Sequence, residues 1–131
     1  MMFNLLDSHD TERFLTQAGG DKRLEALALA VMFFFPGMPM VYYGDESGME
    51  AAMTRTAAAA SAGSARAGTC DSTGIVKKLA ALKKQPCLSR GGCRVSESGG
   101  VAAIERFFGE QSVTLYLNPS DEARTCPAGP P

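Results

Sequence analysis

Residues 21–44 read DKRLEALALAVMFFFPGMPMVYYG, and this stretch decides the fold that the sequence predicts. Apolar residues recur at helical spacing from Leu24 to Phe35, and Asp21 stands where it can cap the first turn. Pro36–Gly37 ends the helix, and the β-rich run Pro39–Tyr43 then has the length of a strand. We therefore expect a helix that is followed at once by a strand.

A short apolar run, Met1–Leu6, precedes this helix and also has the length of a buried strand. Strand, helix and strand with short connections are typical of a parallel α/β sheet or barrel. The residues expected in its core or its wall are Phe33–Phe35, Met38, Met40, Tyr42 and Tyr43.

Beyond residue 74 the sequence predicts one more helix and three more strands. Ile75, Leu79 and Leu82 form the apolar face of a short amphipathic helix that ends before Pro86. Its lysines are expected on a solvated face: Lys77, Lys78, Lys83 and Lys84. Three strand-like runs follow, with glycine-containing turns between them: Cys93–Ser96, Val101–Phe108 and Ser112–Asn118. Their spacing predicts an antiparallel meander.

The segment Ala51–Gly74 differs in composition from everything around it. It contains nine alanines and no Leu, Ile, Val, Phe, Tyr or Trp. Such a segment buries too little apolar surface to offset the entropy of ordering it, which favours a flexible linker. An alanine-rich helix is the alternative interpretation, although glycines at 63 and 68 weaken it.

Composition excludes several classes of function for this chain of 131 residues. Thirteen basic and fourteen acidic side chains leave a net charge of −1, so neither nucleic acid nor an anionic membrane is an expected partner. The longest apolar run, Ala26–Phe35, is too short to span a bilayer. One histidine and four widely spaced cysteines give no zinc-binding spacing, so no metal or cofactor is expected. No secretory leader opens the sequence, which favours a cytoplasmic location.

Four polar side chains follow directly after the first predicted strand: Asp7, His9, Asp10 and Glu12. Active sites of barrels gather at the carboxyl ends of their strands. Carboxylates beside a histidine suit glycosidic cleavage, because an ionised Asp stabilises the cationic centre that develops. The alternative interpretation is that Ser8 or Asp10 simply caps a short helix over Thr11–Leu15. The residues alone favour neither interpretation.

Two blocks of the sequence resemble the α-amylase family, glycoside hydrolase family 13. Residues 4–15, NLLDSHDTERFL, resemble the fourth conserved region of that family, closest to the neopullulanase, cyclomaltodextrinase and maltogenic amylase branch. Residues 36–50, PGMPMVYYGDESGME, resemble the eighth barrel strand of the same branch and the loop after it. The spacing between the blocks also fits, and residues 3–50 and 75–120 follow the family pattern.

The resemblance implies an α/β fold. The chain would contain the last two β/α units of a (β/α)8 TIM barrel and the truncated start of an antiparallel β-sheet C-terminal domain. Five segments follow from this interpretation: residues 1–50 as barrel, 51–74 as a low-complexity segment, 75–92 as the last barrel helix and its connection, 93–120 as part of the all-β domain, and 121–131 as a disordered tail.

The resemblance also implies roles for individual residues. Asp10 matches the family's third catalytic Asp, which stabilises the transition state, and His9 matches the histidine that hydrogen-bonds the same sugar. Independently of the resemblance, Asp45 and Glu46 are expected to anchor their loop through hydrogen bonds and charge pairing and not to act in catalysis. The family's Asp nucleophile and Glu acid/base follow the fourth and fifth strands, so both would lie upstream of Met1.

We therefore expect a fragment of a glycoside hydrolase that acts on an α-glucan such as cyclodextrin, pullulan or maltooligosaccharide. The whole enzyme would use the retaining mechanism, and this chain alone would be inactive. Whether the whole enzyme forms a homodimer stays open. Two alternatives also stay open: a non-catalytic carbohydrate-binding or interaction remnant, and an unrelated small α/β domain.

The family pattern breaks after Glu50. This branch continues with Gly-Gly-Asn-Asp-Pro-Asp-Cys-Arg-Arg, whereas residues 51–60 read AAMTRTAAAA. Residues 50–60 can be back-translated so that the same bases, read from the third base of the Glu50 codon, encode that motif. Only the Asp overlapping Thr54 is forced by the code. We hypothesise that one base was lost in the Glu50 codon and that the frame was restored near Gly74.

Overall fold

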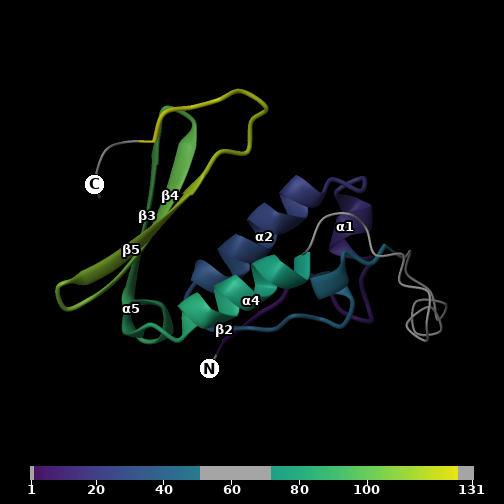
Figure 1. Ribbon diagram of the computed structural model, residues 1–131, viewed down its shortest axis with the longest axis horizontal. Helices are drawn as coiled ribbons and strands as arrows, with labels where there is room; N and C mark the ends of the chain where they lie inside the picture. The colour runs from purple at the N-terminus through teal and green to yellow at the C-terminus, as the bar shows by residue number, and fades with distance from the viewer. Residues whose placement is uncertain (1, 51–71, 127–131) are drawn as a thin grey trace.

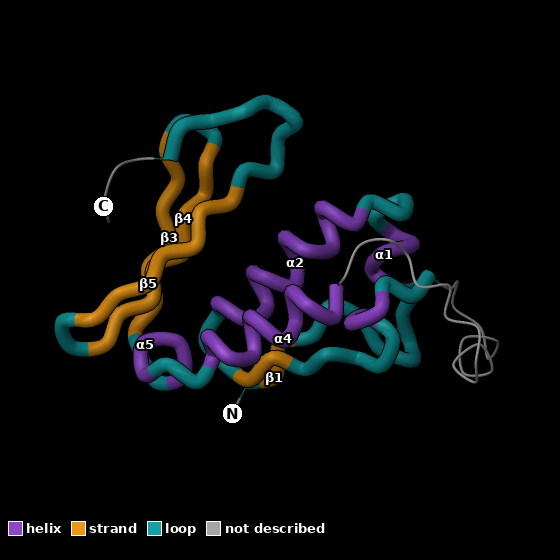
Figure 2. Tube along the Cα trace, viewed as in Figure 1, coloured by secondary structure: helices purple, strands orange, loops and turns teal. Residues whose placement is uncertain are grey.

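The computed structural model describes residues 2–50 and 72–126 (Figure 1). The elements, in chain order, are β1 (Phe3–Asn4), α1 (Phe14–Gln17), α2 (Lys22–Phe34), β2 (Met38–Pro39), the 3-10 helix η1 (Asp45–Ser47), α4 (Ser72–Lys83), α5 (Pro86–Ser89), β3 (Gly92–Ser98), β4 (Val101–Phe108) and β5 (Gln111–Leu117). Helices α2 and α4 lie side by side, and the three-stranded sheet stands at one end of the molecule (Figures 1 and 2).

Helix α2 forms where the sequence predicts it. The Asp21 carboxylate accepts a hydrogen bond of 2.8 Å from the backbone N–H of Arg23, which caps the first turn. The helix ends at Phe34, two residues before Pro36, because proline cannot continue the backbone ladder. The predicted helix and both of its end signals are thus confirmed.

Strands β1 and β2 form a parallel pair around α2, but they are shorter than expected. Phe3 lies opposite Met38, and Asn4 lies opposite Pro39. Gly37, between α2 and β2, has φ of +116°, and a Cβ there would lie 2.9 Å from the Met2 carbonyl oxygen. A side chain at this position would therefore push the two closely spaced backbones apart.

Two expectations about these strands are wrong. The second strand lies at Met38–Pro39 and shares only Pro39 with the expected run Pro39–Tyr43, and the first covers two residues of the run Met1–Leu6. Met38 and Met40 are 46% and 49% exposed, so they are not core residues. The physical reason is that β1 and β2 pair only with each other among the described residues, which leaves their outer edges and faces uncovered.

The described core lies between α2, α4, α5 and the sheet. Its buried members come from all of these elements: Leu29, Met32, Phe33, Phe34, Leu79, Cys87, Leu88 and Ile104. The sheet is the predicted antiparallel meander, in the order β3-β4-β5, with Val95 opposite Ile104 and Ile104 opposite Leu115. This part of the sequence interpretation is confirmed.

Two cations hold the C-terminal end of α2. Buried Arg106 donates to the carbonyl oxygens of Phe34 (2.6 Å), Gly91 (2.8 Å) and Gly92 (3.0 Å). Lys83 donates to those of Phe33 (2.8 Å) and Phe35 (3.0 Å). The last carbonyls of a helix lack intrahelical donors and carry its negative end. The expectation that Lys83 lies on a solvated face is therefore wrong.

Several sequence interpretations fall wholly or partly outside the described residues. The linker and frameshift hypotheses concern Ala51–Gly74, of which the structure describes only the start of α4. Of the predicted tail, residues 121–126 are described, and Arg124 Nη1 donates to the Gly99 carbonyl oxygen at 2.9 Å. Among the described residues, no helix has the length and apolar character needed to cross a membrane.

Candidate functional site

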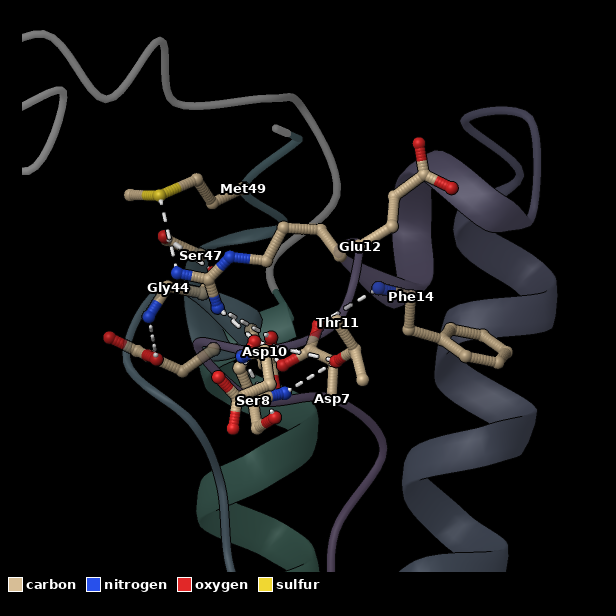
Figure 3. A network of polar contacts seen from close by, with 12 residues as sticks. Asp7, Ser8, Asp10, Thr11, Glu12, Phe14, Gly44, Ser47 and Met49 are labelled. Carbon is tan, nitrogen blue, oxygen red and sulfur yellow. Dashed lines mark hydrogen bonds and ion pairs between the residues drawn. The ribbon is translucent and has the colours of Figure 1, made fainter. Parts of the chain in front are cut away.

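A turn after β1 carries the two residues expected to contact sugar, His9 and Asp10. Figure 3 shows Asp10 in the network of polar contacts around this turn. The Ser8 N–H donates to Thr11 Oγ1 at 2.8 Å, and the Asp10 N–H donates to Ser8 Oγ at 3.2 Å. The side chains of His9 and Asp10 are 78% and 80% exposed, and His9 Nε2 lies 3.3 Å from Asp10 Oδ2. The structure therefore brings the two predicted site residues together at the solvent-facing tip of an ordered turn.

Asp7 caps the short helix that follows this turn. Its Oδ2 accepts a hydrogen bond of 2.8 Å from the backbone N–H of Phe14, where α1 begins. The interpretation in which Ser8 or Asp10 caps a helix over Thr11–Leu15 is wrong, because α1 starts later and takes its acceptor from Asp7. The side chains of Ser8 and Asp10 cap no helix in the described part of the chain.

Arg13 lies beneath the turn and joins it to the segment after β2. Arg13 Nη1 is 3.3 Å from Asp45 Oδ1 and 3.6 Å from Asp7 Oδ1. The guanidinium carbon lies 4.5 Å from the centre of the Tyr42 ring and 4.7 Å from that of Tyr43, within the range of cation–π contacts. Arg13, Asp7 and Asp45 are 3%, 2% and 5% exposed, so this is a buried cluster.

The expected anchoring role of Asp45 and Glu46 is confirmed. Asp45 pairs with Arg13, and Glu46 Oε2 accepts a hydrogen bond of 2.9 Å from the Gly44 N–H. Gly44 has φ of +98°, a conformation that favours glycine, and it begins the tight turn through η1. Sequence reasoning missed Arg13 itself, and its only signal was its place within the block of residues 4–15.

Electrostatics in this cluster are unbalanced. Burial, together with the neighbouring Asp7 carboxylate, raises the pKa of Asp45 to about 7, against the opposing effect of Arg13. Burial also raises the pKa of Glu25 on α2, whose Oε2 accepts a hydrogen bond of 3.1 Å from Ser72 Oγ. Within residues 2–50 and 72–126, no group of three or more His, Cys, Asp or Glu side chains could hold a metal ion.

Comparison with known proteins assigns the family. The alpha-amylase catalytic domain family matches residues 1–97, well over half of the chain. The chain belongs to the alpha-amylase family. Members of this family have a TIM-barrel catalytic domain, and the β1–α2–β2 unit of this chain is consistent with that architecture. The alternative of an unrelated small α/β domain is therefore wrong.

Relatives within the family carry the names of the expected branch. A cyclomaltodextrinase from a Bacillus species is 60% identical over 50 residues, covering 38% of this chain and 9% of the relative. A cyclomaltodextrinase from Geobacillus thermopakistaniensis is 33% identical over 129 residues, covering 95% of this chain and 22% of the relative. The chain thus spans less than a quarter of the length of these two relatives.

A solved structure gives the same picture in three dimensions. The ligand-free cyclic alpha-maltosyl-(1→6)-maltose hydrolase from Arthrobacter globiformis matches with a TM-score of 0.80 and 32% identity. The match covers 89% of this chain and 27% of the hydrolase. This alpha-amylase family chain is therefore similar over most of its length to one part of a much longer glycosidase.

Proposed function

We propose that this chain is the C-terminal part of a retaining α-glucan hydrolase and that it contacts the sugar through Asp10 and His9. The single observation that carries the proposal is the placement of these side chains, 3.3 Å apart and exposed, at the tip of the turn after β1. In this role Asp10 stabilises the cationic, oxocarbenium-like transition state, and His9 donates a hydrogen bond to the same sugar.

The proposal assigns β1 and β2 to the seventh and eighth strands of the barrel, with α2 and α4 as the helices that follow them. Support comes from the parallel pairing of β1 with β2 across α2 and from the position of α4 after β2. Sheet β3-β4-β5 is then the start of the C-terminal domain. A cytoplasmic location and the segment boundaries stay predictions.

We further propose that the chain alone does not cleave glycosidic bonds. A retaining glycosidase needs a nucleophile and an acid/base with carboxyl groups roughly 5–5.5 Å apart. Asp7 and Asp45 are buried against Arg13, which removes both from contact with a substrate. Asp10 fits the third, stabilising role and supplies neither of the two covalent functions.

The test uses the purified full chain with maltoheptaose as the binding probe. Binding is measured through the NMR signals of His9. We expect weak binding by the wild type and a several-fold loss of affinity in Asp10→Asn. Glu110→Gln, which removes an exposed carboxylate in the β4–β5 turn, is the matched control and should bind like the wild type. Equal affinities for the wild type and Asp10→Asn would show that the site is misassigned.

Turnover of β-cyclodextrin, pullulan and soluble starch is measured with the same preparations. We expect none, and turnover that depends on Asp10 would overturn the claim that the covalent machinery is missing. A non-catalytic binding remnant stays the alternative. It predicts that adding the upstream part of the barrel, with its nucleophile and acid/base, never restores turnover, whereas the proposed function predicts that it does.

A further inference from the structure

We infer that Asp7, Arg13 and Asp45 are positioning residues for the His9–Asp10 turn, and that the two carboxyl groups hold one proton between them in the folded chain. The part of this inference that concerns sugar rests on the proposed function. The part that concerns the proton and the order of the turn stands on the geometry of the cluster.

Charge counting supports the shared proton. The cluster places two carboxylates against one guanidinium, with all three side chains at most 5% exposed. A buried charge without a partner is strongly unfavourable, and the usual response of such a group is to change its protonation state. One proton on the two carboxyl groups makes the cluster neutral.

The unused acceptor atoms point to the same proton. Asp7 Oδ2 accepts from the Phe14 N–H, and Asp45 Oδ1 accepts from Arg13 Nη1. The other two oxygens, Asp7 Oδ1 and Asp45 Oδ2, are buried and find no hydrogen-bond donor among the described residues. A proton on Asp45 would make this carboxyl group a donor, with the neighbouring Asp7 carboxylate as its acceptor, and buried polar atoms require such a partner. It also agrees with the raised pKa of Asp45.

The cluster controls the turn because it closes both of its ends. Asp7 precedes the turn and Arg13 follows it, and the bond from the Phe14 N–H to Asp7 joins the two ends directly. Arg13 then connects the two ends of the turn to Asp45 on the segment after β2. His9 and Asp10 lie between these anchors, so a shift of the cluster moves the tip that carries them.

Other charged groups also face the cluster, so the titration of Asp45 must be isolated. Glu25 on α2 interacts electrostatically with Asp7, and Lys22 and Glu50 act on Glu25 in turn. Tyr42 interacts with Arg13 and Asp7, and Glu46 is engaged by the Gly44 N–H. The polar groups that α4 contributes nearby, Ser72 and Thr73, do not titrate in this range. The variant Asp45→Asn keeps the shape of the side chain and removes only its titration.

The proton is tested by the NMR titration of ¹³C-labelled Asp carboxyl groups in the full chain, from pH 3 to 9. We expect one carboxyl group to titrate near neutral pH and its step to vanish in Asp45→Asn. The control Asp121→Asn, whose side chain is 89% exposed, should leave that step in place. Titration of every Asp carboxyl group below pH 5 would overturn the shared proton.

Positioning is tested with Arg13→Lys, which keeps the charge and loses the planar fork and its stacking on the two tyrosines. We expect the Ser8–Thr11 hydrogen bonds to open, seen as faster amide exchange in the turn, and affinity for maltoheptaose to fall about tenfold. The matched control is Arg23→Lys, because Arg23 is 77% exposed. Unchanged exchange and affinity in Arg13→Lys would overturn the positioning role. The role would be supported if the affinity for maltoheptaose changes between pH 6 and 8 in the wild type but not in Asp45→Asn.

These readouts separate the inference from the proposed function. If the wild type does not bind maltoheptaose at all, the proposed function fails. Carboxyl titration and amide exchange still test whether the cluster of Asp7, Arg13 and Asp45 holds a proton and orders the turn. If Asp45→Asn binds with the same pH dependence as the wild type, the proton does not act on the site, and the proposed function stands. His9, the single histidine of the chain, is present in both proteins, so its contribution cancels in this comparison.

Discussion

Replacing Arg106 by Met tests whether a buried cation joins the three-stranded sheet to α2. The Arg106 side chain is 2% exposed and donates three hydrogen bonds, all to backbone carbonyl oxygens. One acceptor, Phe34, ends α2, and the other two, Gly91 and Gly92, lead into β3. Methionine keeps most of the apolar volume of the side chain and removes all three donors.

The expected loss is large because several terms act together. A hydrogen bond from a charged donor is worth about 1.5–3 kcal/mol, so three bonds amount to roughly 4–9 kcal/mol before desolvation. The guanidinium is hydrated in the unfolded wild type, and the cost of removing that hydration on folding offsets several kcal/mol of this sum. We therefore expect the free energy of unfolding to fall by about 3–5 kcal/mol, against a total of roughly 5–15 kcal/mol for a typical domain.

Urea unfolding followed by far-UV circular dichroism measures this loss, since the chain has no tryptophan. With a slope of roughly 1–3 kcal/mol per molar, the midpoint should fall by more than about 1 M. Arg90→Met is the control, because exposed Arg90 only stacks on Phe108 at 5.6 Å, and it should cost less than about 1 kcal/mol. A loss below 1 kcal/mol in Arg106→Met, with an unchanged slope, would refute the reasoning.

Three further predictions follow from other parts of the molecule. Gly37→Ala should lower the midpoint of thermal unfolding, since a Cβ would lie 2.9 Å from the Met2 carbonyl oxygen at φ of +116°, whereas Gly109→Ala, with open space around it, isolates the cost of positive φ alone. The pKa of Asp45 is raised from 3.8 to about 7, so the folded state binds the extra proton. The stability that this proton contributes is complete below about pH 4 and is lost as the pH rises through 7. Asp45→Asn should remove that decline in urea titrations at several pH values, and parallel curves for the two proteins would contradict it. Finally, resequencing codons 50–75 should show the Gly-Gly-Asn-Asp-Pro-Asp-Cys-Arg-Arg motif in a shifted frame, and bases that cannot encode it would end the frameshift hypothesis.

Elements with strong local end signals could be predicted from the sequence. Helix α2 has a capping Asp21 and a Pro36 stop, and the meander has glycines at its turns, so both form where the pattern places them. The strands β1 and β2 lack such signals. Their extent depends on hydrogen bonds to neighbouring strands, and a sequence pattern does not show how many neighbours are present.

The candidate site divides in the same way. The block of residues 4–15 indicated His9 and Asp10, and the structure places them together. It did not indicate that Arg13 contacts Asp45, which lies 32 positions further along the chain. Nor did helical spacing distinguish Lys83, which reaches the end of α2, from the exposed lysines beside it. Charged side chains that bind backbone carbonyls or distant carboxylates look like surface residues in a linear pattern.

The buried cluster of Asp7, Arg13 and Asp45 also affects the charge around the exposed tip of the turn. Arg13 is the cation closest in sequence to Asp10, and a guanidinium paired with Asp10 would weaken its attraction for a positive centre. Asp7 and Asp45 hold Arg13 in the interior, and the two tyrosines cover it. Arg13 therefore does not pair with exposed Asp10, whose described ion-pair neighbour is His9. Under the proposed function, in which Asp10 faces an oxocarbenium-like centre, a second buried acid after β2 therefore benefits a site that it does not touch.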